Sequence, residues 1–320
     1  MFLKSFIKNY NRNLVLTAVL IFIIMLMLAS VAPIDFPKGQ IDVHIPSNSS
    51  LTSISESLAD QNIISSPFVF KVFVVIFGGQ RGLFAGDYRF TKSENVIRIA
   101  YRMVNGNQGL PKIKITIPEG TNVYDMAYIY LTKFRHFNAP RFVSLALQHE
   151  GYLFPDTYYF LSNVKPEEVI RTMRNNFDDK IKTLDTDIKA SNKILEEIII
   201  MASIVEEEEK VSDDRKIIAG ILWKRLNEGI PLQVDAPFYY ITGRRGGFTY
   251  DDLKIDSPYN TYKYKGLPKG PISNPSLDAI KATLNPVATS HYYYLTGKDG
   301  ITRYADTYDG HLKNKNVYLR

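Results

Sequence analysis

The stretch Leu195–Lys210, LEEIIIMASIVEEEEK, places four consecutive glutamates at the end of an apolar segment. On a helix that turns 100° per residue, Glu206 lies within roughly 40° of Ile199 and Ala202 and so continues their apolar face. An apolar wall raises the pKa of a carboxyl group, because burial disfavours its charged form. Glu206 is therefore a candidate general acid that keeps its proton near neutral pH.

The three neighbouring glutamates leave other assignments open. Glu207 falls on the polar side of the helix, whereas Glu208 and Glu209 lie beside apolar positions and remain candidates. Four carboxylates at a helix C-terminus oppose the helix dipole, so contacts elsewhere in the fold must hold at least one of them in place. The alternative without chemistry is a charged helix end in water.

The last ninety residues supply side chains that could bind a sugar. In PLQVDAPFYY, Gln233 and Asp235 could hold N-acetyl or hydroxyl groups, and Asp235 could instead orient Glu206. A second segment, SPYNTYKYKGLPKGPISNPS, is stiffened by prolines and can hold polar groups rigidly against a glycan. Its candidate contacts are Tyr259, Asn260, Thr261, Ser273 and Asn274. The alternative is that these residues only form turns.

A second carboxylate is available in EGYLFPDTYYF, where Glu150 could serve as a further acid. Glycosidases that use two carboxylates are the commoner design. The chain has no cysteine, which excludes disulfides, thiolate metal sites and a cysteine nucleophile. The five histidines show no spacing typical of metal ligands.

The net charge is +6, with lysine and arginine scattered along the chain and no nucleic-acid motif, so no nucleic-acid partner is expected. The segment Leu14–Ala32 is 19 residues long and uncharged, which is enough to span most of a hydrocarbon core of about 30 Å. Basic residues at 4, 8 and 12 precede it, which predicts a cytoplasmic N-terminus. A cleaved signal peptide is the alternative, but the apolar run is too long and Pro33 stands at the cleavage position.

Two stretches share one pattern of alternating strand, proline, polar turn and helix: HIPSNSSLTSISESL and TIPEGTNVYDMAYIY. This spacing resembles the small LysM-like unit, which elsewhere binds the glycan of peptidoglycan, although such a unit can equally be scaffold. Helices are predicted after Ser49 or Ser50, from Ser66-Pro67, from Lys165-Pro166 and up to Gly229. From Pro231 onward the chain is predicted to be mostly loops.

The expected fold class is α+β, with an N-terminal transmembrane helix, LysM-like β/α modules and a larger mixed α/β catalytic domain. The predicted divisions are a cytoplasmic N-terminus over 1–13, a membrane helix over 14–32, a linker over 33–40, the membrane-proximal module over 41–148 and the catalytic domain over 149–320. The catalytic domain is expected on the outer, periplasmic side of the plasma membrane.

From about Ile41 to the C-terminus, the chain contains several motifs that resemble those of the endolytic murein transglycosylases, the MltG or YceG-like family, and they occur in the same order as in that family. They are EGYLFPDTYYF, MASIVEEE, ILWKRLNEGIPLQVDAPFYYITG, SPYNTYKYKGLPKGPISNPSLDAIKATLNP and YYYLTGKDG. The resemblance implies that the glutamate after Ser-Ile-Val is the catalytic acid, and this position maps onto Glu206. The family often has a basic residue and a threonine around that glutamate, whereas this chain has Glu207 and Glu209.

The resemblance also implies an activity that needs no metal and no organic cofactor, and it implies partners. The expected reaction cleaves the β-1,4 bond between N-acetylmuramic acid and N-acetylglucosamine in nascent peptidoglycan, leaves 1,6-anhydro ends and terminates glycan strands. The expected partners are peptidoglycan strands, the membrane through the N-terminal helix, and peptidoglycan synthases. Two alternatives stay open, a non-catalytic glycan-binding scaffold and a hydrolase that uses Glu150 or Asp235 as its second carboxylate.

Overall fold

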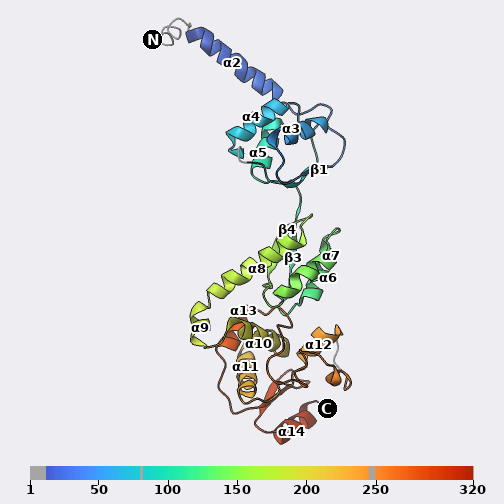
Figure 1. Ribbon diagram of the computed structural model, residues 1–320, viewed down its shortest axis with the longest axis vertical. Coiled ribbons are helices and arrows are strands. Elements are labelled where there is room, and N and C mark those ends of the chain that lie inside the picture. The colour runs from blue at the N-terminus through green and yellow to red at the C-terminus, as the bar shows by residue number, and fades with distance from the viewer. Residues whose placement is uncertain (1–11, 80–81, 245–248, 320) are drawn as a thin grey trace. The chain divides into compact units, whose positions relative to one another are not determined.

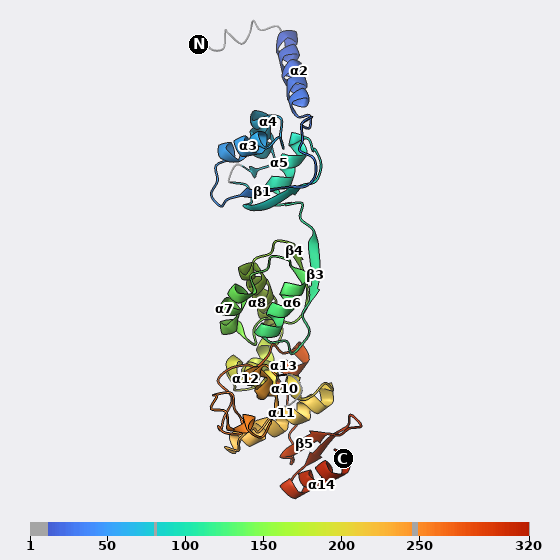
Figure 2. The same cartoon turned by 90° about the vertical axis from the view of Figure 1, so that its right-hand side faces the viewer.

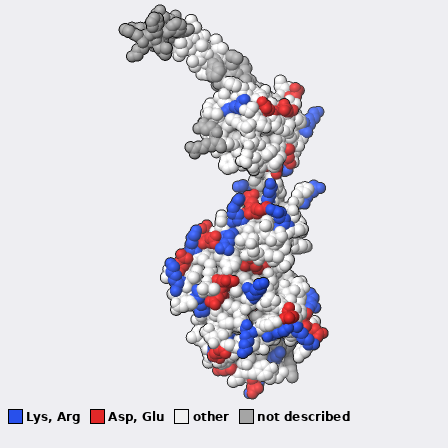
Figure 3. Space-filling view, in the orientation of Figure 1, with Lys and Arg blue, Asp and Glu red and all other residues white. Residues whose placement is uncertain are grey.

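The computed structural model describes residues 12–79, 82–244 and 249–319 of the chain (Figure 1). The chain divides into two compact units, residues 1–111 and 112–320. In both units helices are combined with small antiparallel sheets of two strands each, which confirms the α+β class. On the face seen in Figure 3, basic and acidic side chains are interspersed.

Helix α2 (Arg12–Ala29) covers most of the segment that the sequence predicts to cross a membrane. Among the described residues, no helix is both long enough and apolar enough for such a span. The predicted cytoplasmic segment lies outside the described residues, apart from the backbone of residues 12 and 13.

The first unit continues from strand β1 into two helices, a return strand and a further helix. The elements are β1 (Ile41–Ile45), α3 (Leu51–Asp60), α4 (Pro67–Ile76), β2 (Gly86–Phe90) and α5 (Val96–Val104). Strands β1 and β2 are antiparallel, with Ile41 opposite Phe90. The predicted helix starts are confirmed, because Ser50 and Ser66 cap α3 and α4 by accepting from backbone N–H groups three residues on.

The second unit opens with the same order of elements (Figure 2). They are β3 (Lys112–Thr116), α6 (Val123–Lys133), α7 (Ala139–Ala146), the short helix η3 (Leu147–His149) and β4 (Thr157–Leu161). Strand β3 pairs with β4 over its whole length. The sequence predicts a boundary at residue 149, whereas the compact units meet between Pro111 and Lys112, because β3 and β4 form one sheet.

The rest of the second unit is mainly helical. It contains α8 (Pro166–Lys182), α9 (Asp185–Ala190), α10 (Leu195–Glu208), α11 (Ser212–Asn227), α12 (Ala236–Thr242), η4 (Asp252–Lys254), α13 (Leu277–Leu284), β5 (Tyr293–Thr296), β6 (Thr302–Ala305) and α14 (Tyr308–Tyr318). Helices α10, α11 and α13 pack against one another, and Trp223 of α11 donates a hydrogen bond of 3.0 Å to the carbonyl of Thr283.

Among the described residues beyond Pro231, most positions lie outside helices and strands, which confirms the prediction that this part of the chain is mostly loops. This region holds α12, α13, the hairpin of β5 and β6, and α14. These elements are short, and a helix of about two turns gains its stability from packing rather than from propensity. Ala279 and Ile280 of α13 are fully buried, for example, in a cluster that includes Ile198 and Ile199.

Candidate active site

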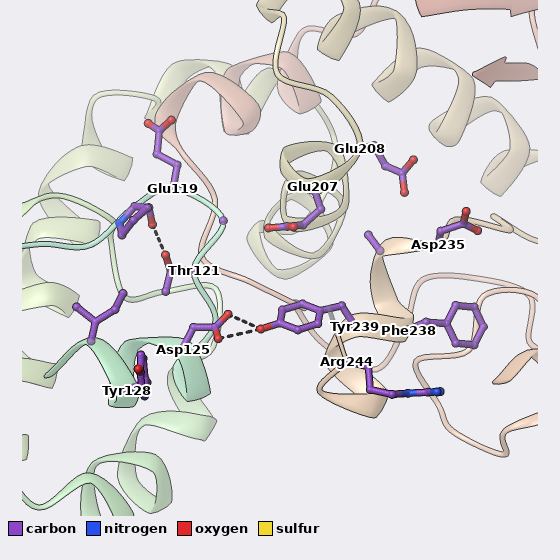
Figure 4. A pocket seen from close by; sticks show the side chains of 14 residues that line it. Glu119, Thr121, Asp125, Tyr128, Glu207, Glu208, Asp235, Phe238, Tyr239 and Arg244 are labelled. Carbon is purple, nitrogen blue, oxygen red and sulfur yellow. Dashed lines mark hydrogen bonds between the residues drawn. The ribbon is translucent and has the colours of Figure 1, made fainter. Parts of the chain in front are cut away.

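A pocket of about 1060 Å³ opens in the second unit where three segments meet (Figure 4). Its walls come from the turn before α6 and from α6 itself, from the end of α10, and from residues around α12. A second pocket, of about 600 Å³, shares Glu119, Gly120, Glu207 and Glu208 with the first and extends to Thr296 and Gly300. The two pockets therefore form one groove, defined here by these shared residues, and the end of α10 lies along it.

Glu208 is the glutamate of α10 with the properties of a general acid. Its side chain lines both pockets. Burial raises the pKa of Glu208 to about 7, and the negative charge of Asp235 adds to this effect. Hydrogen bonds from the Tyr294 hydroxyl, at 2.9 Å, and from the backbone N–H groups of Ala236 and Asp235 act in the opposite direction. The result is a carboxyl group that keeps its proton close to neutral pH and faces the groove.

Glu206 has a different environment. It is buried, as the helical pattern predicts, but its carboxylate lies against a cationic side chain rather than an apolar surface. Arg215 Nη2 donates to Glu206 Oε1 at 2.7 Å, and both the backbone N–H and the hydroxyl of Ser276 donate to Oε2, at 2.9 and 2.5 Å. Both carboxylate oxygens thus accept hydrogen bonds, one of them from an arginine, so the Glu206 side chain links α10 to α11 and to the start of α13.

The other two glutamates at the end of α10, Glu207 and Glu209, have environments that differ from those of Glu206 and Glu208. Glu207 is exposed and lines both pockets. Glu209 is buried and accepts from Thr302 Oγ1 at 2.5 Å and from the N–H groups of Lys210 and Val211. Burial alone favours a higher pKa for Glu209, but these hydrogen bonds outweigh it and its pKa is lowered. Consecutive carboxylates therefore have opposite tendencies to hold a proton.

Four of the predicted sugar contacts are internal. Asn260, Thr261, Ser273 and Asn274 are at most 2% exposed. The Asn260 amide donates to the carbonyls of Leu253 and Ile255, both at 2.9 Å, and Thr261 is bonded to the backbone of Val234. Their polar side-chain atoms form hydrogen bonds to other groups of the protein. These residues therefore hold the loops behind the groove rather than line it.

Asn274 and Glu150 form one such internal contact. Asn274 Nδ2 donates to Glu150 Oε1 at 2.7 Å, and Glu150 Oε2 accepts from the N–H of Val123 at the start of α6. Burial raises the pKa of Glu150 to about 8. Among the described residues, the lining of the groove does not include Glu150. In this position Glu150 serves as an anchor for the start of α6.

The remaining predicted contacts divide between groove and scaffold. Asp235 lines the larger pocket on the same side as Glu208 (Figure 4). Burial raises the pKa of Asp235, and a hydrogen bond from Tyr262 opposes the rise. Gln233 adopts a left-handed backbone with φ 52° and accepts from Arg225, and the Tyr259 ring packs 5.0 Å from that of Tyr240.

Several lining residues were not predicted from the sequence. Asp125 and Tyr128 of α6 and Tyr239 of α12 line the larger pocket, and the Tyr239 hydroxyl contacts both carboxylate oxygens of Asp125, at 2.8 and 2.7 Å (Figure 4). Asp125 and Tyr128 are three residues apart on one helix face, a spacing that could have marked them as a pair. In the part of the chain that the structure describes, no acidic or histidine cluster could hold a metal ion.

The family model described as the YceG-like family matches residues 43–317. The chain belongs to the YceG-like family. This match confirms the resemblance that the motifs indicate. A relative from Bacillus subtilis named endolytic murein transglycosylase is 29% identical, over 88% of this chain and 86% of its own length.

Two further similarities extend this YceG-like assignment. A relative from Streptococcus pneumoniae D39 with the same name is 29% identical over 90% of this chain, and the match spans 60% of that relative's length. The crystal structure of a putative yceG-like protein from Listeria monocytogenes is 30% identical, with a TM-score of 0.59, and the match covers 87% of this chain and 99% of that one.

Proposed function

We propose that this YceG-like chain is a peptidoglycan lytic transglycosylase in which Glu208 is the general acid. It cleaves the β-1,4 bond between N-acetylmuramic acid and N-acetylglucosamine. The observation that carries the proposal is the environment of Glu208, a carboxyl group with a pKa of about 7 on the wall of a groove. The names of the B. subtilis and S. pneumoniae relatives support the reaction class.

The assignment to Glu208 replaces the sequence prediction of Glu206. A general acid must bring its proton to the substrate, and Glu206 has both oxygens engaged by Arg215 and Ser276. Glu208 instead combines the raised pKa with access to both pockets.

The reaction needs only one carboxyl group. Glu208 donates its proton to the glycosidic oxygen, and the bond from that oxygen to C1 of N-acetylmuramic acid breaks. The 6-hydroxyl of the same sugar forms the new bond to C1, and its proton passes to the Glu208 carboxylate, which restores the acid. Because the nucleophile is part of the substrate, no water has to be captured. Asp235 faces the same pocket, where its charge can stabilise the positive charge that develops at C1.

The finer features of the proposal concern the place and the manner of cutting. The groove continues on both sides of Glu208, which suits a bond inside a strand rather than at its end.

The apolar segment 14–32 anchors the chain in the plasma membrane with the enzyme on the periplasmic side, close to the synthases that make new strands. The strand–helix–helix–strand orders of β1 to β2 and β3 to β4 are LysM-like modules, and cutting limits the length of nascent strands.

A hydrolase is the alternative that the site itself favours, because Asp235 shares a pocket with Glu208 and could activate water. Heavy-oxygen water separates the two reactions. The full-length chain in detergent is incubated with uncrosslinked glycan strands in labelled water, and the products are analysed by mass spectrometry. Glu208→Gln is the matched control for contaminating activity.

The proposal predicts products that end in 1,6-anhydro-N-acetylmuramic acid and carry no label. Labelled reducing ends would establish hydrolysis and overturn the proposed reaction. Binding of strands without shortening would indicate the scaffold alternative. Unlabelled anhydro ends that persist in Glu208→Gln would leave the reaction class in place but reject the assigned acid.

A further inference from the structure

The hairpin of β5 and β6 contacts the carboxylates at the end of α10. The Tyr294 hydroxyl of β5 donates to Glu208 Oε2 at 2.9 Å, and Thr302 of β6 donates to Glu209. The Tyr294 ring packs against the apolar cluster that includes Val205 and Leu222. Tyr294, which is 86 residues away in the chain, therefore contacts the candidate acid Glu208 directly.

Tyr294 contacts Glu208 without lining the groove. Among the described residues, the lining of both pockets includes Glu208 but not Tyr294. A phenol in this position affects the substrate only through the carboxyl group that it contacts. Tyr294 thus has the geometry of a residue that orients the acid, not of one that binds a sugar.

We propose that Tyr294 is a positioning residue for the reaction, whose hydroxyl holds Glu208 toward the groove and stabilises the carboxylate left after proton donation. This inference rests on the proposed function of Glu208. The hydrogen bond to a carboxylate is stronger than one to a neutral acid, so it strengthens as the proton leaves. It therefore favours the transition state over the ground state, which is the requirement for acceleration.

The surrounding charges are consistent with a donor that keeps its own proton. Burial, followed by the charge of Glu208, raises the pKa of Tyr294 well above its usual value. Three other groups interact with this pair. The charge of Asp235 raises the pKa values of both Glu208 and Tyr294, and the charge of Arg225 lowers the pKa of Tyr294. The charge of Glu208 in turn raises the pKa of Tyr262. Among the described residues, Tyr294 is the side chain that donates a hydrogen bond to Glu208, and none of these three groups adds a second one.

The test compares Tyr294→Phe with Tyr304→Phe in the full-length chain. Tyr304 lies on the same hairpin, and its hydroxyl donates to Asp214 at 2.5 Å instead of to Glu208. Formation of 1,6-anhydro ends is followed from pH 5 to 9 at constant ionic strength, and kcat and KM are determined at each pH. The thermal midpoint of each variant shows whether it is folded.

Tyr294→Phe should lower kcat by about tenfold to a hundredfold and leave KM nearly unchanged, as expected for loss of one hydrogen bond to a charged group. Because that bond lowers the pKa of Glu208, its loss should move the alkaline limb of the profile to higher pH. Tyr304→Phe should leave the limb in place. An unmoved limb in Tyr294→Phe, or an equal shift in Tyr304→Phe, would overturn the proposal.

A second measurement covers the case in which Tyr294→Phe fails to fold. Replacing Tyr294 by 3-fluorotyrosine keeps the ring and makes the hydroxyl a stronger donor, so the alkaline limb should move to lower pH. A limb that stays in place would reject the inference. If Glu208→Gln is as active as the native chain, the proposed function fails first; if it is inactive while both Tyr294 variants keep the native profile, only the role of Tyr294 fails.

Discussion

Arg215 donates a hydrogen bond of 2.7 Å to Glu206, and both side chains are buried between α10 and α11. The same guanidinium donates to Asp278 at 2.9 Å and to the carbonyl of Glu209 at 2.7 Å. Arg215 thus joins three segments at the end of α10. This network accounts for a glutamate on an otherwise apolar helix face, and it engages both carboxylate oxygens of Glu206, whereas Glu208 lines both pockets of the groove.

The first prediction concerns the stabilising role of Glu206. Glu206→Gln removes the charge that faces buried Arg215, and breaking a buried pair in this way costs about 3 kcal/mol or more. For a unit of this size the thermal midpoint should fall by roughly 6–12 °C. Glu207→Gln is the control, because Glu207 is exposed and such changes stay within about 0.5 kcal/mol. Equal unfolding midpoints for the two variants would contradict the structural role.

The second prediction concerns the pH dependence of activity. Glu208 has a pKa raised to about 7, so its acid form is present below that pH and is lost above it. The rate of formation of anhydro ends should therefore fall about tenfold per pH unit well above pH 7. Initial rates at constant ionic strength give the profile, with the folded fraction checked at each pH. A rate that keeps rising through pH 8 would argue against a carboxyl acid of this kind.

The third prediction concerns stability, and it follows from Glu150. Its pKa is raised from 4.5 to about 8 by burial, so between these values the folded chain binds more protons than the unfolded chain. Stability from this group is complete below about pH 4.5 and is lost as pH rises toward 8, by at most about 1.4 kcal/mol per pH unit. Glu150→Gln should flatten this dependence. Urea unfolding at pH 5.5 and 7.5 measures it, and equal slopes for the two chains would contradict the linkage.

The fourth prediction concerns sugar stacking in the larger pocket. Tyr128 of α6 lines this pocket and is 70% exposed, so its ring offers a face to a sugar. Tyr128→Ala should weaken binding of glycan strands by about twofold to tenfold, in line with typical energies of aromatic contacts. Tyr159→Ala is the matched control, because Tyr159 is 62% exposed on β4 and lies outside the pocket lining. Calorimetry with the inactive Glu208→Gln chain provides the affinities, and equal losses in both variants would count against stacking.

Local features of the fold could be predicted from the sequence because they depend on neighbouring residues. The serine caps of α3 and α4, the proline at the start of α8 and the alternation in β1 all lie within a few positions of what they stabilise. The short elements after Pro231 could not, since their stability comes from burial against α10 and α11.

The proposed assignment of the acid to Glu208 could not be reached from the sequence for the same reason. The helical pattern places Glu206 on the buried face, and that part is correct. The pattern does not reveal that Arg215 and Ser276 stand opposite, or that Tyr294 and Asp235 surround Glu208. Likewise, an asparagine in a proline-rich loop can face a substrate or the protein interior, and Asn274 does the latter. In both cases the deciding partners are distant in the chain.

The most direct test of the central claim compares Glu208→Gln with Glu206→Gln in one assay of 1,6-anhydro ends. It is run with the full-length chain, well below the thermal midpoint of each variant, and rates are expressed per folded molecule. The account predicts that Glu208→Gln loses at least about a hundredfold in rate at unchanged stability, whereas Glu206→Gln loses stability but keeps most of its rate. Near-native activity of Glu208→Gln, with activity abolished in folded Glu206→Gln, would contradict it.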